Sequence, residues 1–331
     1  MSRGITATGV DGLPEVYPGD DLASMLVRHA GPLYDGDIVV VTSKVVSKSE
    51  ARVVASGREE AVVDETARVV ARREQTVIAR TRHGITLAAA GVDASNTKPG
   101  TVVLLPLDPD ASARRLRRAI RRDPGRNVAV VISDTAGRPW RLGQTDIAIG
   151  CAGLPAYVDH AGMTDRHGNT LDVTAPAVAD EIAGLADLVM GKLDHCPAAV
   201  LRGLGEYVLA PEDDGPGADA LIRDDAGDLF ALGAQDAVVA AVRRDDDRAL
   251  EALGARGRDV PEILELADAA GLAADLDGDT LVRIRGADDP RTAAALERVC
   301  AIAAASGWVV AEDGRDDGRC HVTLRRRTPR N

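Results

Sequence analysis

Buried strands and amphipathic helices follow one another along the first two thirds of the chain. Residues 37–43 (DIVVVTS) and 127–132 (NVAVVI) are short runs rich in β-branched residues, which is typical of strands buried on both faces. Residues 198–201 predict a further buried strand. Apolar side chains recur at steps of four, three and four from Val178 to Val189, which predicts an amphipathic helix.

Weaker patterns fill the gaps between these elements. Two helices are predicted, over residues 59–73 and about 112–122, and two short strands, over residues 76–79 and 101–105. The second helix carries six arginines, which favours a solvent-exposed face. Residues 136–175 are rich in turn signals, and residues 165–169 (DRHGN) predict a hairpin tip.

The pattern changes near residue 243, where a run of charged residues begins. The last 80-odd residues predict two helices, a strand (280–285), a helix (291–305) and two strands (308–311 and 320–324). Asp289 as N-cap, Pro290 in the first turn and Gly307 after the end frame the last of these helices. A chain of 331 residues exceeds one ordinary core. We therefore expect two domains, residues 1–244 and a small α/β appendage, residues 245–331.

Composition excludes several classes of partner. Lys plus Arg number 40 and Asp plus Glu 52, so the net charge is 40 − 52 = −12, which repels a nucleic-acid backbone. Aromatic residues make up only 2% of the chain, too few for the stacking platforms that single-stranded nucleic acid requires. Four scattered cysteines indicate reduced thiols, and no run of apolar residues is long enough for a membrane span. We expect a soluble, cytoplasmic protein that does not bind membranes.

Three predicted segments end on compact polar groups. These groups are Thr42–Lys44 with Lys48, Asp93 with Asn96, and Ser133–Thr135. Carboxylate and hydroxyl oxygens suit Mg²⁺ or Mn²⁺, and a lysine beside them would neutralise phosphate charge. The chain has only four lysines against 36 arginines, which makes each lysine informative. Taken alone, each group is a weak signal, because an aspartate after a strand is more often a turn residue or a helix N-cap.

The segment Gly137–Asp146 (GRPWRLGQTD) follows the second of the two strongest strands. It carries the substrate candidates Arg138, Arg141, Gln144 and Asp146 and one of the two tryptophans, Trp140. Guanidinium groups bind carboxylates and phosphates in a bidentate manner. An ordinary solvated loop is the alternative. The chain contains no Walker or Rossmann glycine motif, so a nucleotide would need a different cradle.

Eight blocks, taken together, resemble the coenzyme F420-0:L-glutamate ligase family. The blocks keep the family's order over about residues 9–235: 12–16 (GLPEV), 19–22 (GDDL), 36–48 (GDIVVVTSKVVSK), 89–96 (AAGVDASN), 104–106 (LLP), 133–135 (SDT), 143–146 (GQTD) and 179–182 (ADEI). The resemblance implies an α+β mixed-sheet fold, an intimate homodimer, and a GTP-dependent ligase that adds one or more L-glutamates to F420-0 through an acyl phosphate. It also implies Mg²⁺ or Mn²⁺, with K⁺ as a candidate additional cation.

The same resemblance assigns roles to individual residues. Asp93, Asp134 and Thr135 match the family's metal ligands, and Lys48 and Asp134 are the catalytic candidates. The nucleotide-binding positions match Leu13, Pro14, Glu15, Val16, Ser43, Lys48 and Asn96. A looser match places a later nucleotide or metal contribution at residues 202–206.

The chain resembles the ligase domain of the family's bifunctional actinobacterial branch but departs from that branch at its C-terminus. Residues 245–331 are too short for the flavin-binding reductase domain, so we expect no FMN. Two alternatives to the ligase remain open. One is a paralogous amino-acid ligase that acts on another carboxylate, and the other is a non-catalytic nucleotide-binding regulator.

Overall fold

The computed structural model divides the chain into two compact units, residues 1–222 and 223–331. It describes residues 4–95, 97–191, 195–225, 228, 230–244, 249–250, 253, 259–277 and 281–327. Helix α6 (Ala234–Arg243) falls within the second unit. The domain boundary after residue 244 stays a prediction.

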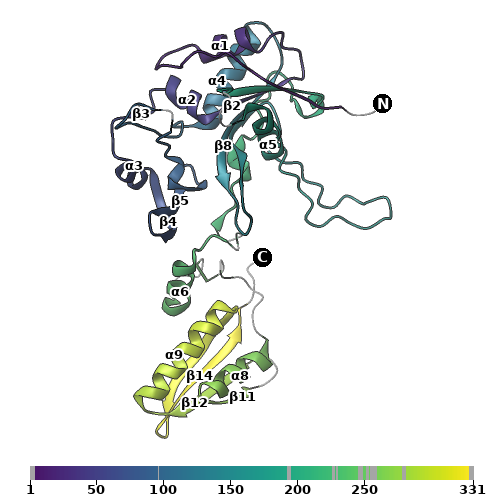
Figure 1. The fold of residues 1–331 in the computed structure, drawn as a ribbon. Helices are drawn as coiled ribbons and strands as arrows, with labels where there is room; N and C mark the ends of the chain where they lie inside the picture. The colour runs from purple at the N-terminus through teal and green to yellow at the C-terminus, as the bar shows by residue number, and fades with distance from the viewer. Residues whose placement is uncertain are drawn as a thin grey trace. The chain divides into compact units, whose positions relative to one another are not determined.

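A five-stranded mixed sheet forms the centre of the first unit (Figure 1). Its strands in spatial order are β1 (Thr6–Gly9), β10 (Ala198–Arg202), β2 (Ile38–Thr42), β8 (Ala129–Gly137) and β9 (Gln144–Ala152). Strands β2 and β8 pair in parallel, and the other neighbours pair antiparallel. The mixture of helices with a mixed sheet agrees with the predicted α+β class, and the three strongest predicted strands are confirmed.

Helices cover both faces of this sheet. The side chains of Val39 and Val41 pack against α1 (Leu22–His29) and α4 (Pro109–Arg122), whereas those of Ile38 and Val40 pack against α5 (Val178–Met190). Successive strand residues point to opposite faces, so a strand apolar at every position must be covered on both sides. Figure 1 shows α4 and α5 on the two sides of β8. The predicted helix at 178–189 is confirmed.

The parallel pairing brings two strand ends to one edge of the sheet. Thr42 pairs with Ser133 at the last position of the β2–β8 ladder. Helix α2 (Ser43–Ser49) begins directly after β2, while β8 continues beyond Ser133 into an antiparallel hairpin with β9. Polar residues that follow the two apolar runs therefore meet at this edge.

One predicted helix is only half correct. Residues 59–73 form helix α3 (Arg58–Glu65) and then strand β4 (Thr66–Arg73), which pairs with β5 (Thr76–Thr81). The three-stranded sheet of this region is completed by β6 (Thr86–Ala88), and a separate pair is formed by β3 (Val53–Val54) and β7 (Val102–Val103). The strand begins at Thr66, and its half-buried positions alternate as Thr66, Arg68 and Val70, a period of two that the charged residues obscure.

Helix α4 corrects a second expectation. Arg117 is not on a solvated face, because only 2% of its surface is exposed. Its guanidinium donates to the carbonyl of Val128 at 2.9 Å, just before β8, and to the carboxylate of Asp214 at 2.9 Å. It also reaches the carbonyls of three residues in the segment 209–213. Arg117 thus ties α4, the start of β8 and the segment after β10 together.

The second unit is built from two α–β–β segments. The first contains α8 (Val260–Ala269), β11 (Ala273–Asp277) and β12 (Leu281–Ala287), and the second contains α9 (Pro290–Ala305), β13 (Trp308–Asp316) and β14 (Arg319–Arg326). The sheet order β11-β12-β14-β13 puts the second strand of each segment in the middle. The Asp289 carboxylate accepts from the amides of Arg291 and Thr292, which confirms the predicted N-cap. Strand β11 lies outside the predicted elements.

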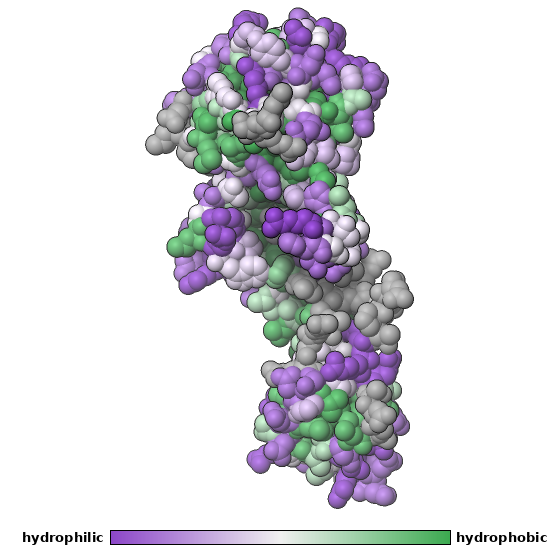
Figure 2. Space-filling model, turned by 90° about the vertical axis from the view of Figure 1, so that its right-hand side faces the viewer, coloured by the Kyte–Doolittle hydropathy of each residue, from purple (hydrophilic) through white to green (hydrophobic). Residues whose placement is uncertain are grey.

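The surface of the chain is mostly polar. Figure 2 shows hydrophilic residues over much of the visible face, with hydrophobic groups gathered in smaller patches between them. Within the described residues, no helix has the length and apolar character that a membrane crossing needs.

Candidate active site

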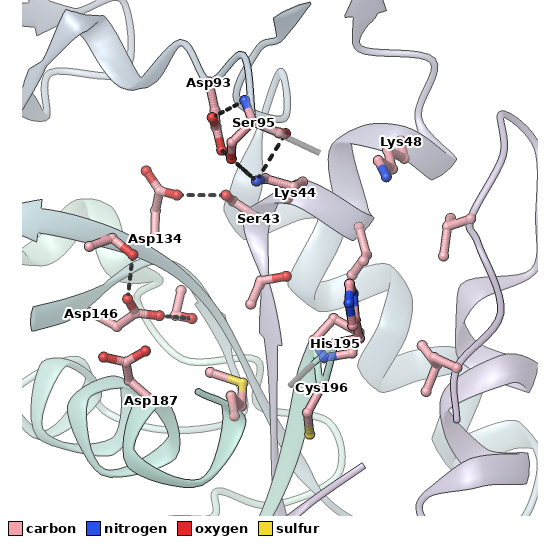
Figure 3. Close-up of a pocket in the computed structure, with 18 of the residues that line it drawn as sticks. Ser43, Lys44, Lys48, Asp93, Ser95, Asp134, Asp146, Asp187, His195 and Cys196 are labelled. Atoms are coloured by element: carbon pink, nitrogen blue, oxygen red, sulfur yellow. Dashed lines mark hydrogen bonds and ion pairs between the residues drawn. The ribbon is translucent and has the colours of Figure 1, made fainter. Parts of the chain in front are cut away.

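A cavity of about 740 Å³ opens at the edge where β2 and β8 end (Figure 3). Its wall comes from five parts of the first unit: the segment after β1, the end of β2 with α2, the segment at residues 93–95, the β8–β9 hairpin, and the end of α5 with the residues that follow it. The lining includes nearly all of the predicted site residues, namely Leu13, Pro14, Glu15, Val16, Ser43, Lys48, Asp93, Asp134, Thr135, Gln144 and Asp146. Residues from positions 13 to 146 therefore meet in one pocket.

A β-bulge in β9 lies opposite the point where the polar residues of β8 begin. Ile132 pairs with Gly150 and Ser133 with Ala148, which leaves Ile149 of β9 as the extra residue. A bulge of this kind bends the strand that carries the extra residue, here β9, and disrupts its pairing with β8 locally. It lies immediately before Asp134, at the point where β8 leaves the apolar core and enters the pocket.

Asp134 lies against the first residue of α2. The Ser43 hydroxyl donates to Asp134 Oδ1 at 2.8 Å (Figure 3). Desolvation raises the pKa of Asp134 to about 6, and the negative charges of Asp146 and Asp93 add to the increase, while the bond from Ser43 opposes it. An acidic group with such a pKa is a strong candidate for binding a cation, which would stabilise its ionised form.

Asp93 forms a second polar cluster above Asp134. Lys44 Nζ lies 2.5 Å from Asp93 Oδ2 and donates to Ser95 Oγ at 2.8 Å. The Ser95 amide donates to Asp93 Oδ1 at 2.6 Å, and two backbone hydrogen bonds with Val103 fix the main chain of Asp93. Desolvation raises the pKa of Asp93, but the hydrogen bonds from Lys44 and Ser95 outweigh it, so the pKa lies below its ordinary value. Asp93 is therefore ionised in a neutral solution.

Lys48 faces the segment after β1 across the pocket. Its Nζ lies 2.5 Å from Glu15 Oε1, and the lysine side chain is 13% exposed. Val16 is buried in the core beneath α1 and so anchors the segment that carries Leu13, Pro14 and Glu15. The two lysines of α2 thus present ammonium groups to the same cavity.

Asp146 supports the hairpin from inside. Its side chain is buried, and it accepts hydrogen bonds from Ser133 Oγ and Thr135 Oγ1, both at 2.8 Å. Ser133 and Thr135 lie two residues apart on β8, so they share a face opposite to that of Asp134. Asp146 therefore fixes the β8 backbone around Asp134.

Two predicted site residues lie elsewhere, and a third is not described. Arg138 and Arg141 are exposed at the tip of the β8–β9 hairpin and do not line the cavity. Asn96 lies outside the described residues. The roles assigned to all of the site residues stay predictions, since no ligand marks them.

Sequence reasoning passed over several residues of the cavity. Lys44 stood beside the candidates, but its pairing with Asp93 depends on a contact between residues 49 positions apart in the sequence. Asp187, His195 and Cys196 come from the end of α5 and the segment before β10 and also line the cavity. An amphipathic helix pattern explains Asp187 without a site, so the sequence holds no signal that separates it from surface carboxylates.

The donor set suits a hard cation held jointly with a phosphate. Over the part of the chain that the structure describes, no group of three or more His, Cys, Asp or Glu side chains forms a ready metal site. Asp93 and Asp134 nevertheless lie close enough for the charge of one to raise the pKa of the other. Mg²⁺ is commonly bound by one or two carboxylates with water and substrate phosphates, and the two aspartates fit this pattern.

Comparison with known proteins identifies the family. The model of the family F420-0:Gamma-glutamyl ligase matches residues 12–203, which include the whole cavity lining. A coenzyme F420:L-glutamate ligase of Methanothermobacter thermautotrophicus is 37% identical over 225 residues, covering 60% of this chain and 89% of the relative. Proteins of the same name from Methanopyrus kandleri and Natronomonas pharaonis are 38% and 39% identical, covering 65% and 67% of this chain and 93% of each relative. The chain therefore belongs to the F420-0:γ-glutamyl ligase family.

Proposed function

We propose that the chain joins L-glutamate to the lactyl carboxylate of F420-0, using GTP, in the biosynthesis of coenzyme F420. The names of its relatives support glutamate ligation. The resemblance in the blocks described above supports GTP as the nucleotide, a homodimer and a location in the cytoplasm. The observation that carries the proposal is the meeting of Lys44, Lys48, Asp93 and Asp134 in one cavity inside the matched region.

The proposed reaction has two steps. A carboxylate oxygen of F420-0 attacks the γ-phosphorus of GTP. The bond between the γ-phosphorus and the oxygen that bridges it to the β-phosphate breaks, GDP departs, and an acyl phosphate of F420-0 is formed. The amine of glutamate then attacks the acyl carbon, the bond from that carbon to the phosphate oxygen breaks, and the amide and inorganic phosphate form. The amine loses its proton to solvent in this second step.

The residues of α2 supply positive charge to the first step. Lys44 and Lys48 are held by Asp93 and Glu15 in the ligand-free chain, and phosphate oxygens can replace or share those carboxylate partners. Fixed cations that meet the charge developing on a transferred phosphoryl group lower the barrier. The Ser43 hydroxyl, already directed at Asp134, holds that carboxylate in place.

Asp93 and Asp134 would hold Mg²⁺ or Mn²⁺. A bound ion of this kind supplies Lewis-acid stabilisation of the phosphate oxygens. Asp146 maintains the direction of the strand that carries Asp134 through its bonds to Ser133 and Thr135. Burial is the main cause of the raised pKa of Asp134, and a cation between the two aspartates would offset the smaller contribution from the charge of Asp93.

The test is a ligation assay with the full chain, F420-0, L-glutamate, GTP and Mn²⁺, followed by mass spectrometry of the product and quantification of GDP. We expect glutamylated F420 and GDP in equal amounts, and little product with Asp134→Asn. Asp224→Asn, a change of an exposed aspartate outside the matched region, is the matched control and should leave turnover unchanged. Absence of product from the wild-type chain, while a relative works under the same conditions, would refute the proposal.

A further inference from the structure

The tip of the β8–β9 hairpin is a closed turn beside the cavity. The last pair of the ladder is Gly137 with Gln144, so residues 138–143 form the tip. Arg138 Nη2 donates to the carbonyl of Leu142 at 2.6 Å, across the base of the turn. Gly143 has φ of +86°, and a Cβ there would lie 3.2 Å from Arg138 Nη2, so glycine suits this position. The turn is therefore braced by its own side chain.

This braced turn displays two large apolar side chains. Trp140 is 82% exposed and Leu142 is 98% exposed. Trp140 has φ of +59°, a left-handed conformation that is uncommon for a bulky residue. The only other tryptophan of the chain, Trp308, is 1% exposed and belongs to the core of the second unit. A chain with so few aromatic residues thus places one of its two tryptophans at an exposed position on this braced turn.

The position of the tip matches the shape of the acceptor. Thr135 and Gln144, at the root of the hairpin, line the cavity, and Asp134 lies in the same wall. Four residues of extended chain separate Asp134 from Arg138, which is about 13 Å at the rise of a β-strand. F420-0 is elongated in the same sense, with the reacting carboxylate at one end, a phosphodiester and ribityl chain in the middle and a planar deazaflavin ring at the other end.

We propose that Trp140 stacks on the deazaflavin ring of F420-0 while the carboxylate end of this acceptor reaches Asp134. This inference rests on the proposed function. Indole offers a large flat face for stacking on an aromatic ring, and a turn already held by the Arg138–Leu142 hydrogen bond loses less conformational freedom on binding. Arg141, the next residue, adds a cation suited to the phosphodiester. In this arrangement, Trp140 recognises the deazaflavin ring of the acceptor, and the residues of the cavity carry out the ligation.

A binding titration tests the proposal without turnover. Trp308→Phe leaves Trp140 as the single tryptophan, and F420-0 added to this variant should quench its fluorescence. The dissociation constant of F420-0 should rise about 5- to 150-fold in Trp140→Ala, from the 1–3 kcal/mol that aromatic stacking contributes per base. Trp140→Phe should recover most of the affinity, and Leu142→Ala, at the same tip, should change it less than Trp140→Ala. Nucleotide binding should be unchanged in all of these variants.

The outcomes separate this inference from the proposed function. Unchanged affinity for F420-0 in Trp140→Ala overturns the stacking, whether or not the wild-type chain ligates glutamate. A change of oligomeric state in Trp140→Ala on light scattering, with unchanged affinity, also overturns it and makes the tip a contact between copies. Loss of affinity together with rescue by phenylalanine supports the stacking even if the nucleotide or the amino acid of the reaction differs from those proposed.

Discussion

Replacing Arg117 with methionine should destabilise the first unit strongly. Methionine has a similar length and no charge, so the change removes the hydrogen-bond donors while leaving much of the volume filled. The buried guanidinium of Arg117 has six acceptors, which would lose this partner: the carbonyls of Val128, Leu209, Ala210 and Asp213 and the side chains of Asn127 and Asp214.

The magnitude follows from the burial of the pair. Removing one partner of a buried ion pair costs about 3–5 kcal/mol, because the other partner stays buried without its counter-charge. Asp214 is partly exposed and retains Arg118, which places the expected loss at about 3 kcal/mol, the lower end of that range. For a unit of this size, 1 kcal/mol corresponds to about 2–4 °C, so the melting temperature of the first unit should fall by roughly 6–12 °C.

Thermal unfolding followed by circular dichroism measures the effect. Arg118→Met is the matched control, since Arg118 lies on the same helix, contacts the same carboxylate and is 68% exposed. The control should shift the melting temperature by at most a few degrees. Equal shifts in the two variants would refute the reasoning, because burial would then not explain the role of Arg117.

Three further predictions concern pH, the nucleotide and the hairpin. Desolvation raises the pKa of Asp214, but hydrogen bonds from Arg118 and Arg117 outweigh it and hold that pKa below its ordinary 3.8. The ionised carboxylate therefore stabilises the fold fully above pH 4, and this contribution is lost as the pH falls through the lowered pKa. Asp214→Asn should lose stability less steeply than wild type in an acid titration below pH 4, and identical profiles would contradict this. Lys48→Ala should raise the KM for GTP roughly 10- to 150-fold by removing a charged hydrogen bond of about 1.5–3 kcal/mol, whereas the exposed Lys98→Ala should not, and equal KM values would remove Lys48 from the nucleotide site. Ser133→Ala should lower the free energy of unfolding by about 1–3 kcal/mol, because the buried Asp146 loses a hydrogen bond; urea denaturation measures this loss, and an unchanged midpoint would exclude it.

The sequence predicts the central sheet well because burial on both faces leaves a simple mark. A strand that is apolar at every position, as in β2 and the start of β8, has few other interpretations. The region after Glu65 was misread because charged residues satisfy the periodicity of a helix and of a strand alike, and only its pairing with β5 decides between them. The pattern of apolar and charged residues within one segment does not reveal that the segment pairs with another strand after a turn.

The same limit applies to the site. Asp134 and Ser43 are each predicted at the end of an apolar strand, but periodicity does not show that the two strand ends converge. The structure joins the two side chains at 2.8 Å. The bulge at Ile149 and the support from Asp146 depend on the register of two strands, which the sequence does not state. The buried role of Arg117 has a similar cause: its five arginine neighbours in α4 share its chemistry, and only the contacts with distant segments distinguish it.

The oxygen of the acceptor carboxylate gives the most direct test of the proposed ligation. F420-0 labelled with ¹⁸O in its lactyl carboxylate is incubated with the chain, GTP, Mn²⁺ and L-glutamate, and the released phosphate is analysed by mass spectrometry. Formation of an acyl phosphate predicts one ¹⁸O atom in the phosphate for each glutamate ligated. Glutamylated product accompanied by unlabelled phosphate would contradict the acyl phosphate, and absence of product would contradict the ligation itself.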